Sequence, residues 1–157
     1  MVKYLMMFLV VMIYVVIELC DNKEKLKIII YYLFNNTRLL INMEIMKEAK
    51  DPWFSLISCG LKTVEGRLFR DDYVNLSVGD KIVFINNELG FRRSCKVIIK
   101  RISHYSSLYD YLETETLEKC LPTITVIEKG IDIYYKFYAE DDKNKYGILA
   151  MEIELMN

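Results

Sequence analysis

The chain has 157 residues, of which 53% are hydrophobic and 13% aromatic, so it can bury the core of one domain, with room for an extension. Its formal net charge of −1 argues against a protein that is held to its partner mainly by phosphate contacts.

The cysteines and the single histidine are too scattered for a metal centre. The cysteines are Cys20, Cys59, Cys95 and Cys120, none of them in a C-x-x-C pair, and the histidine is His104. A structural zinc site needs about four clustered N or S ligands, and secreted disulfide scaffolds are denser in cysteine. We therefore expect reduced thiols, no metal, no cofactor and a cytoplasmic protein.

The first forty residues differ in character from the rest. Residues 4–17 carry no charge, but this run is shorter than the ~20 residues that span a bilayer, and no signal-peptide cleavage site follows it. Regular caps, turns and alternation begin at Met43, which divides the chain into an extension (1–42) and a domain (43–157). Three interpretations of the extension stay open. It lies upstream of a true start at Met43, it anchors the protein in a membrane through residues 4–20, or it is a helix buried against the domain.

Residues 51–60 predict a short helix. Asp51 and Pro52 are typical of a helix start, and Gly60 is typical of a helix end. Trp53 and Phe54 follow the start directly, which favours a core position for the indole over a role in stacking on a nucleobase.

The next stretch, GLKTVEGR (60–67), predicts a strand with a polar face. Alternation places Thr63, Glu65 and Arg67 on one face and apolar residues on the other. A carboxylate and a guanidinium are therefore neighbours on one face, and Lys62 stands at the start of the strand.

Further strands are predicted over residues 82–85, 95–102 and 148–155, with a hairpin loop between the first two. Residues 82–85 are apolar on both faces, which predicts burial on both sides. Helical spacing follows Ser107 and Thr116, stops at Pro122, and returns over residues 127–138, where a core stripe of Tyr134, Tyr135 and Tyr138 is expected. Few strands interrupted by short helices indicate an α+β domain with a small mixed β-barrel.

Four stretches of this domain together resemble one known family. They are PWFSLISCGLKTVEGRL, VGDKIVFIN, KRISHYSSLYDYLETETLEKCLP and IYYKFY with KYGILAMEIEL, and they span residues 52–155. The family is the ASCH family, named for homology to an activating signal cointegrator. The resemblance implies a PUA-like β-barrel that binds RNA or a modified nucleoside in a cleft beside the barrel. Some members are amidohydrolases that deacetylate N4-acetylcytidine.

The resemblance also implies site residues. In the hydrolases a Lys, a Thr three residues later and a distant Glu form the site. Lys62 matches the Lys, Glu65 occupies the Thr position, and Glu128 is the candidate for the distant Glu by its order along the chain. Candidate ligand-binding residues are Lys62, Thr63, Glu65, Arg67, His104 and Tyr105.

Two functions and one structural role remain open at this point. A Lys–Glu pair keeps the lysine protonated, which suits binding of an anion better than catalysis, while the Glu65–Arg67 pair could also serve only to order a polar cleft. Residues 62–101 hold nine basic and five acidic residues, which is compatible with a phosphate-binding face. The expected partner is RNA or a nucleoside, and the expected state is a monomer.

Overall fold

The computed structural model describes Val11, residues 42–138, Asp142 and residues 145–156. Contacts divide the chain into two units, Met1–Asn42 and Met43–Asn157, and the fold described below is that of the second. The interpretations of residues 1–42, including an anchor through residues 4–20, concern residues almost all of which lie outside the described ones. Within the described part of the chain, no helix combines the length and the apolar character needed to cross a bilayer.

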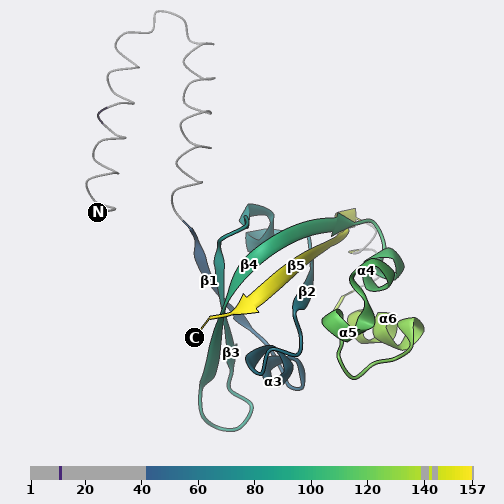
Figure 1. Cartoon of the computed structure of the whole chain (residues 1–157), viewed down its shortest axis with the longest axis horizontal. Coiled ribbons are helices and arrows are strands. Elements are labelled where there is room, and N and C mark those ends of the chain that lie inside the picture. Colours follow the sequence, from purple (N-terminus) through teal and green to yellow (C-terminus); the bar gives the residue numbers. More distant parts are fainter. Residues whose placement is uncertain (1–10, 12–41, 139–141, 143–144, 157) are drawn as a thin grey trace, which may run out of the picture. The chain divides into compact units, whose positions relative to one another are not determined.

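The domain is α+β, as predicted, and is built on one curled sheet (Figure 1). Its strands are β1 (Glu44–Glu48), β2 (Val64–Leu68), β3 (Lys81–Asn86), β4 (Arg93–Tyr105) and β5 (Ile148–Leu155). They are arranged in the order β1-β3-β4-β5-β2. Only the β1–β3 pair is parallel, so the sheet is mixed and forms an incomplete barrel with β1 and β2 at its two edges.

Short helices complete the domain. They are α3 (Trp53–Ser58), the 3-10 helix η1 (Asp71–Asn75), α4 (Leu108–Glu115), α5 (Leu117–Cys120) and α6 (Ile127–Tyr135). Figure 1 shows α4, α5 and α6 grouped together, while α3 precedes β2. The helix predicted after Asp51 is present, and the Asp51 carboxylate accepts hydrogen bonds from the backbone N (3.1 Å) and Oγ (2.6 Å) of Ser55.

The hydrophobic side chains form two clusters, and β5 contributes to both. Leu149 and Met151 belong to the cluster that includes Phe54 of α3, whereas Ile148 and Ala150 belong to the cluster beneath α4, α5 and α6. Successive side chains of a strand point to opposite faces. Strand β5 is therefore buried on both faces.

The prediction of two-sided burial for residues 82–85 is wrong. Ile82 and Phe84 are buried, but Val83 and Ile85 are only half-buried. The cluster beneath α4, α5 and α6 contains no residue of β3, so among the described residues the second face of β3 is not part of a hydrophobic core.

Two further differences from the sequence patterns concern β1 and α6. Strand β1, with the sequence EIMKE, was not predicted, because an edge strand of mixed composition has no clear alternation. Helix α6 ends at Tyr135 rather than Tyr138. Tyr134 is buried and Tyr138 is half-buried, but Tyr135 is 46% exposed and does not belong to the core stripe that was expected.

Candidate functional site

A pocket of about 320 Å³ opens between the two edges of the sheet. Its lining comes from the end of β1 and the residues after it, from the start of α3, from β2, and from the α5–α6 region. The lining side chains used below are Trp53, Lys62, Glu65, Arg67, Tyr134 and Tyr138, and the backbone of Gly66 also lines the pocket. The gap between the edge strands β1 and β2, called here the seam of the barrel, therefore provides a concave site of the size that small-ligand pockets have.

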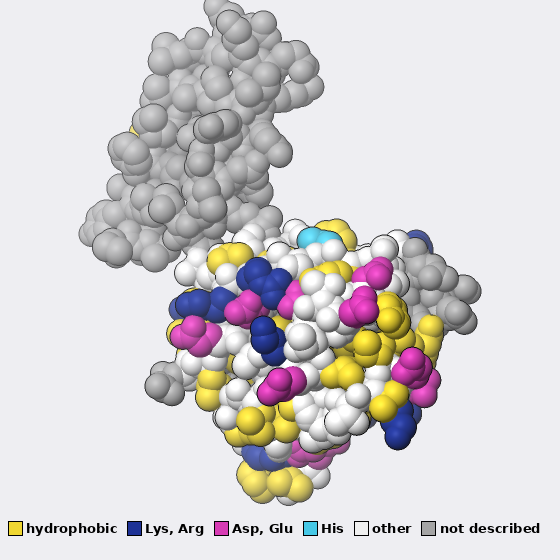
Figure 2. Space-filling view, turned by 45° about the vertical axis from the view of Figure 1, so that its right-hand side comes forward, with side chains coloured by type: hydrophobic (Ala, Val, Ile, Leu, Met, Phe, Trp, Pro, Cys, Tyr) yellow, Lys and Arg dark blue, Asp and Glu magenta, His cyan; other side chains and the backbone are white. Residues whose placement is uncertain are grey.

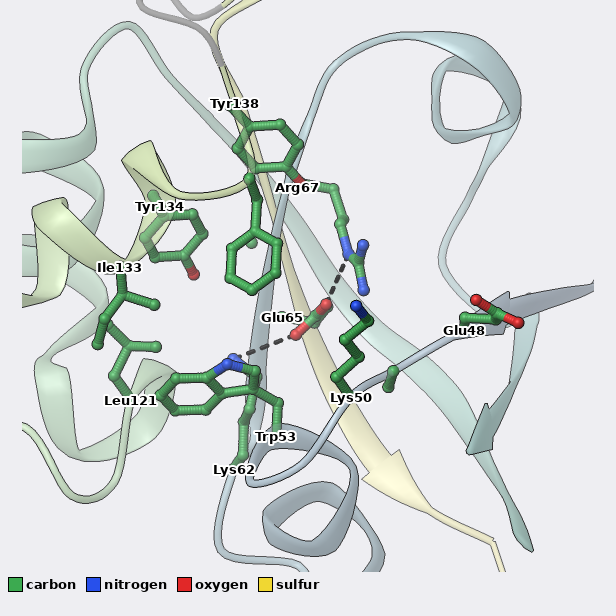
Figure 3. A pocket seen from close by; sticks show the side chains of 13 residues that line it. Glu48, Lys50, Trp53, Lys62, Glu65, Arg67, Leu121, Ile133, Tyr134 and Tyr138 are labelled. Atoms are coloured by element: carbon green, nitrogen blue, oxygen red, sulfur yellow. Dashed lines mark hydrogen bonds and ion pairs between the residues drawn. The ribbon is translucent and has the colours of Figure 1, made fainter. Parts of the chain in front are cut away.

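Lys62 and Arg67 hold Glu65 between them (Figure 3). Lys62 Nζ lies 3.1 Å from Glu65 Oε2, and Arg67 Nε donates to Glu65 Oε1 at 2.6 Å. The side chains of Lys62 and Glu65 are 2% and 8% exposed, whereas that of Arg67 is 24% exposed. The carboxylate is thus buried beneath an arginine that still reaches the pocket.

The Lys62 ammonium is fully used by the fold. Besides the contact with Glu65, Nζ donates to the carbonyl oxygens of Val64, at 2.7 Å, and of Cys120. An ammonium has three donors and no acceptor, and these three acceptors match it. Lys62 therefore ties β2 to the end of α5.

The Glu65 carboxyl group is held in its ionised form. Burial alone would raise its pKa, but the charges of Arg67 and Lys62, together with their hydrogen bonds, lower the pKa below the ordinary value. The same pairing acts on Arg67, where burial would lower the pKa and Glu65 raises it above the ordinary value. The pair is consequently charged on both sides at neutral pH.

Gly66, between the two charged residues, is required by packing. A Cβ atom at this position would lie 2.6 Å from the hydroxyl oxygen of Tyr111 and 2.7 Å from Cζ of the same ring. The Tyr111 hydroxyl in turn lies 3.1 Å from that of Tyr134, which lines the pocket. The glycine in GLKTVEGR therefore lets a phenol ring of α4 lie directly against β2.

Aromatic side chains form much of the pocket wall. In Figure 3, Trp53 and Tyr138 lie on opposite sides of the Glu65 carboxylate, and Tyr134 also lines the pocket. Trp53 is half-buried. Its indole packs against the cluster beneath α4–α6, in line with the predicted core position, and it also lines the pocket.

The structure brings together only part of the predicted site. Lys62, Glu65 and Arg67 line the pocket, but Thr63, Glu128, His104 and Tyr105 do not. Glu128 is exposed on the first turn of α6, and His104 is exposed with its ring edge-on to Phe69 at 4.6 Å between centroids. Thr63 bonds through its backbone to Lys119 and Ile153.

Tyr105 belongs to a second charged cluster outside the pocket. Its hydroxyl donates to Glu115 Oε1 at 2.7 Å, and Arg101 donates to both oxygens of Glu115, at 2.8 and 2.5 Å. Arg101 also donates to Glu152 at 2.8 Å and to Ser103 Oγ at 2.5 Å. The cluster connects α4 with β4 and β5.

Sequence reasoning missed the pocket residues that come from other segments. Lys50 follows β1 and is exposed at the pocket, and Tyr134 and Tyr138 reach it from α6 and the turn after it. The four-residue spacing of the two tyrosines indicated one helix face, but not that this face meets the seam of the barrel. Only the sheet order, with β1 and β2 as edges, brings these segments together.

The basic stretch 62–101 does not form an uncompensated basic face. Arg70, Lys96 and Lys100 pair with Asp142, Glu44 and Glu154, all of them acids from outside the stretch. On the face drawn in Figure 2, Lys and Arg side chains are interspersed with Asp and Glu. Strand pairing places acidic segments beside basic ones, so the charge excess along the chain is neutralised in space.

The described residues contain no cluster of three or more His, Cys, Asp or Glu that could hold a metal ion. Cys59, Cys95 and Cys120 are free thiols, and burial raises the pKa of the Cys95 and Cys120 thiols to about 11. Thiols with raised pKa are poor nucleophiles at neutral pH. The chemistry of the site is therefore that of its carboxylate, its cations and its aromatic rings.

A curled mixed sheet with a pocket of ligand size at its seam defines a small α+β domain, and the comparisons with known proteins identify its family. The chain belongs to the ASCH domain family, whose model matches residues 48–157. Among solved structures, it is similar to the hypothetical protein PH0355, with 35% identity and a TM-score of 0.65 over 73% of this chain and 100% of that one. It is also similar to protein PF0455 from Pyrococcus furiosus, with 36% identity and a TM-score of 0.59 over 74% of this chain and 99% of that one. No curated protein matches the chain.

Proposed function

We propose that the pocket binds an unpaired nucleobase, presented by single-stranded RNA or by a free nucleoside. The observation that carries this proposal is the composition of the pocket, in which the Glu65–Arg67 pair is flanked by Trp53 and Tyr138. Aromatic walls stack on any base, and a guanidinium beside a carboxylate offers donors and acceptors to a base edge. A pocket of about 320 Å³ also has room for one base and its sugar.

Binding fits the site better than hydrolysis does. A lysine base needs a free lone pair, but the Nζ of Lys62 is directed at two carbonyl oxygens and a carboxylate. Glu65 has each oxygen paired with a cation, and Glu128 is exposed on α6 away from the pocket. The residues matched to a hydrolase site therefore serve here as ligand contacts and as scaffold.

Trp53 gives a direct test of the proposal. It is the only tryptophan of the chain, so the intrinsic fluorescence of the protein reports on the pocket wall. Titration of the full chain with short single-stranded oligouridine is expected to give a saturable change. Arg67→Lys keeps a cation beside Glu65 but loses the planar fork, and should weaken binding about tenfold.

Arg101→Lys is the matched control, because it makes the same change outside the pocket, and it should leave the affinity unchanged. A titration without saturation, or equal losses in both variants, would contradict the proposal. Incubation with N4-acetylcytidine separates the two functions, since accumulation of cytidine would favour the hydrolase and its absence is expected.

A further inference from the structure

The backbone of β2 presents one unpaired residue to the pocket. In the antiparallel β2–β5 pair, Ile153 N donates to the Thr63 carbonyl at 2.9 Å and Phe69 N donates to the Gly147 carbonyl at 3.2 Å. Backbone groups alternate in direction along a strand, and the N–H and C=O of one residue point the same way. The odd-numbered residues of β2 therefore face β5, and Val64, Gly66 and Leu68 face away from it.

The carbonyl groups of two of these three outward residues have partners, which confirms their direction. The Val64 carbonyl accepts from Lys62 Nζ at 2.7 Å, and the Leu68 carbonyl accepts from the backbone N of Arg70 at 2.8 Å. Gly66 lies between them, lines the pocket and is buried. Because β2 is an edge strand, no neighbouring strand pairs with the outward N–H and C=O of Gly66, and no other described residue does so.

A buried backbone donor and acceptor without partners is costly, so such a pair is normally matched by water or by a ligand. We infer that the N–H and C=O of Gly66 pair with the Watson–Crick edge of the bound base, as a neighbouring strand would pair with them. This inference rests on the proposed function and adds the mode of recognition to it.

The ligand class follows from the geometry of one donor beside one acceptor. Uracil offers N3–H beside O4, and cytosine offers N4–H beside N3, so both can pair with the same glycine. A base whose edge is already paired in a duplex cannot. The pocket therefore selects bases with a free Watson–Crick edge and discriminates little between those that carry a donor next to an acceptor.

Methylation of the base donor tests this inference without a change to the protein. Short oligouridine and its counterpart methylated at every N3 are titrated into the full chain, with Trp53 fluorescence as the readout. Loss of one hydrogen bond and burial of an unpaired carbonyl should weaken binding at least about tenfold. The Gly66 amide signal in a ¹⁵N–¹H correlation spectrum should shift with oligouridine, while that of Gly90, in the β3–β4 turn, should not.

The outcomes separate the inference from the proposal on which it rests. Tenfold weaker binding of the methylated strand together with a shift at Gly66 supports both. Equal binding of both strands, or saturable binding without a shift at Gly66, overturns the inference and leaves base binding in place. Absence of binding by either strand overturns both.

Discussion

Two clusters of this domain each bury a glutamate beneath an arginine, yet they differ in how many donors of that arginine the protein itself uses. In the pocket, Glu65 is held by two cations, and Arg67 gives only its Nε to that carboxylate. In the second cluster, Arg101 donates to Glu115, Glu152 and Ser103, and its donors are largely used within the protein.

The two clusters differ in whether cations or carboxylates are in excess. Where cations outnumber the carboxylate, the outer cation keeps donors for a ligand, and Arg67 gives its Nε to Glu65 while its side chain lines the pocket. Where carboxylates outnumber the cation, the cluster is complete and holds elements together. We therefore propose ligand contact for the first cluster and the attachment of α4 for the second.

The largest effect is expected from Lys62→Met. It leaves Glu65 with one cation and removes the donor of the Val64 and Cys120 carbonyls in a buried position. Breaking a buried pair from one side costs about 4 kcal/mol of unfolding free energy. Urea unfolding measures this free energy, and a loss of stability below about 1 kcal/mol would mean that Lys62 does not tie β2 to α5.

Gly66→Ala is expected to be the next most damaging change. The new methyl group would meet the Tyr111 ring, which is fully buried, so that the ring or the strand would have to shift. Overpacking of this kind costs about 3 kcal/mol. Gly90→Ala is the control, because its Cβ meets nothing within 4 Å and only its positive φ of 79° carries a cost, of about 1 kcal/mol. Equal losses of unfolding free energy in the two variants would show that Gly66 is not required for packing against Tyr111.

Glu115→Gln should have a smaller effect on stability and none on binding. It weakens the bonds from Arg101 and Tyr105, but the Arg101 side chain is 43% exposed and solvent screens the pair, so a loss of about 1.5 kcal/mol is expected. Thermal unfolding and the oligouridine titration are run on the same sample. A change in affinity would mean that the second cluster also contributes to the pocket.

The smallest effect is a dependence of stability on acid. The Arg101 hydrogen bonds lower the pKa of Glu115 below its ordinary 4.5, despite the opposing effect of burial. A folded-state pKa below the unfolded one stabilises the protein above pH 4.5, and this contribution is lost as the pH falls through the folded value. Between these values the wild type should lose more stability than Glu115→Gln. Parallel curves of stability against pH for the wild type and the variant would show that ionisation of Glu115 is not linked to folding.

The contrast between the two clusters could be predicted only in part from the sequence. Alternation in GLKTVEGR correctly placed Glu65 and Arg67 on one face, because this pattern depends only on the geometry of a strand. Burial of Lys62 could not be predicted, since it depends on a carbonyl at Cys120, 58 residues away in the chain. The Arg101–Glu115 pair was missed for the same reason, because its residues come from different elements.

The most direct measurement compares the two arginines in one sample. Their Nε–H signals are followed by ¹⁵N–¹H NMR while short single-stranded oligouridine is added to the full chain. If the pocket is the binding site, the Arg67 signal shifts and saturates with the Trp53 fluorescence, and the Arg101 signal stays in place. A shift at Arg101 with none at Arg67 would contradict the assignment of ligand contact to the pocket.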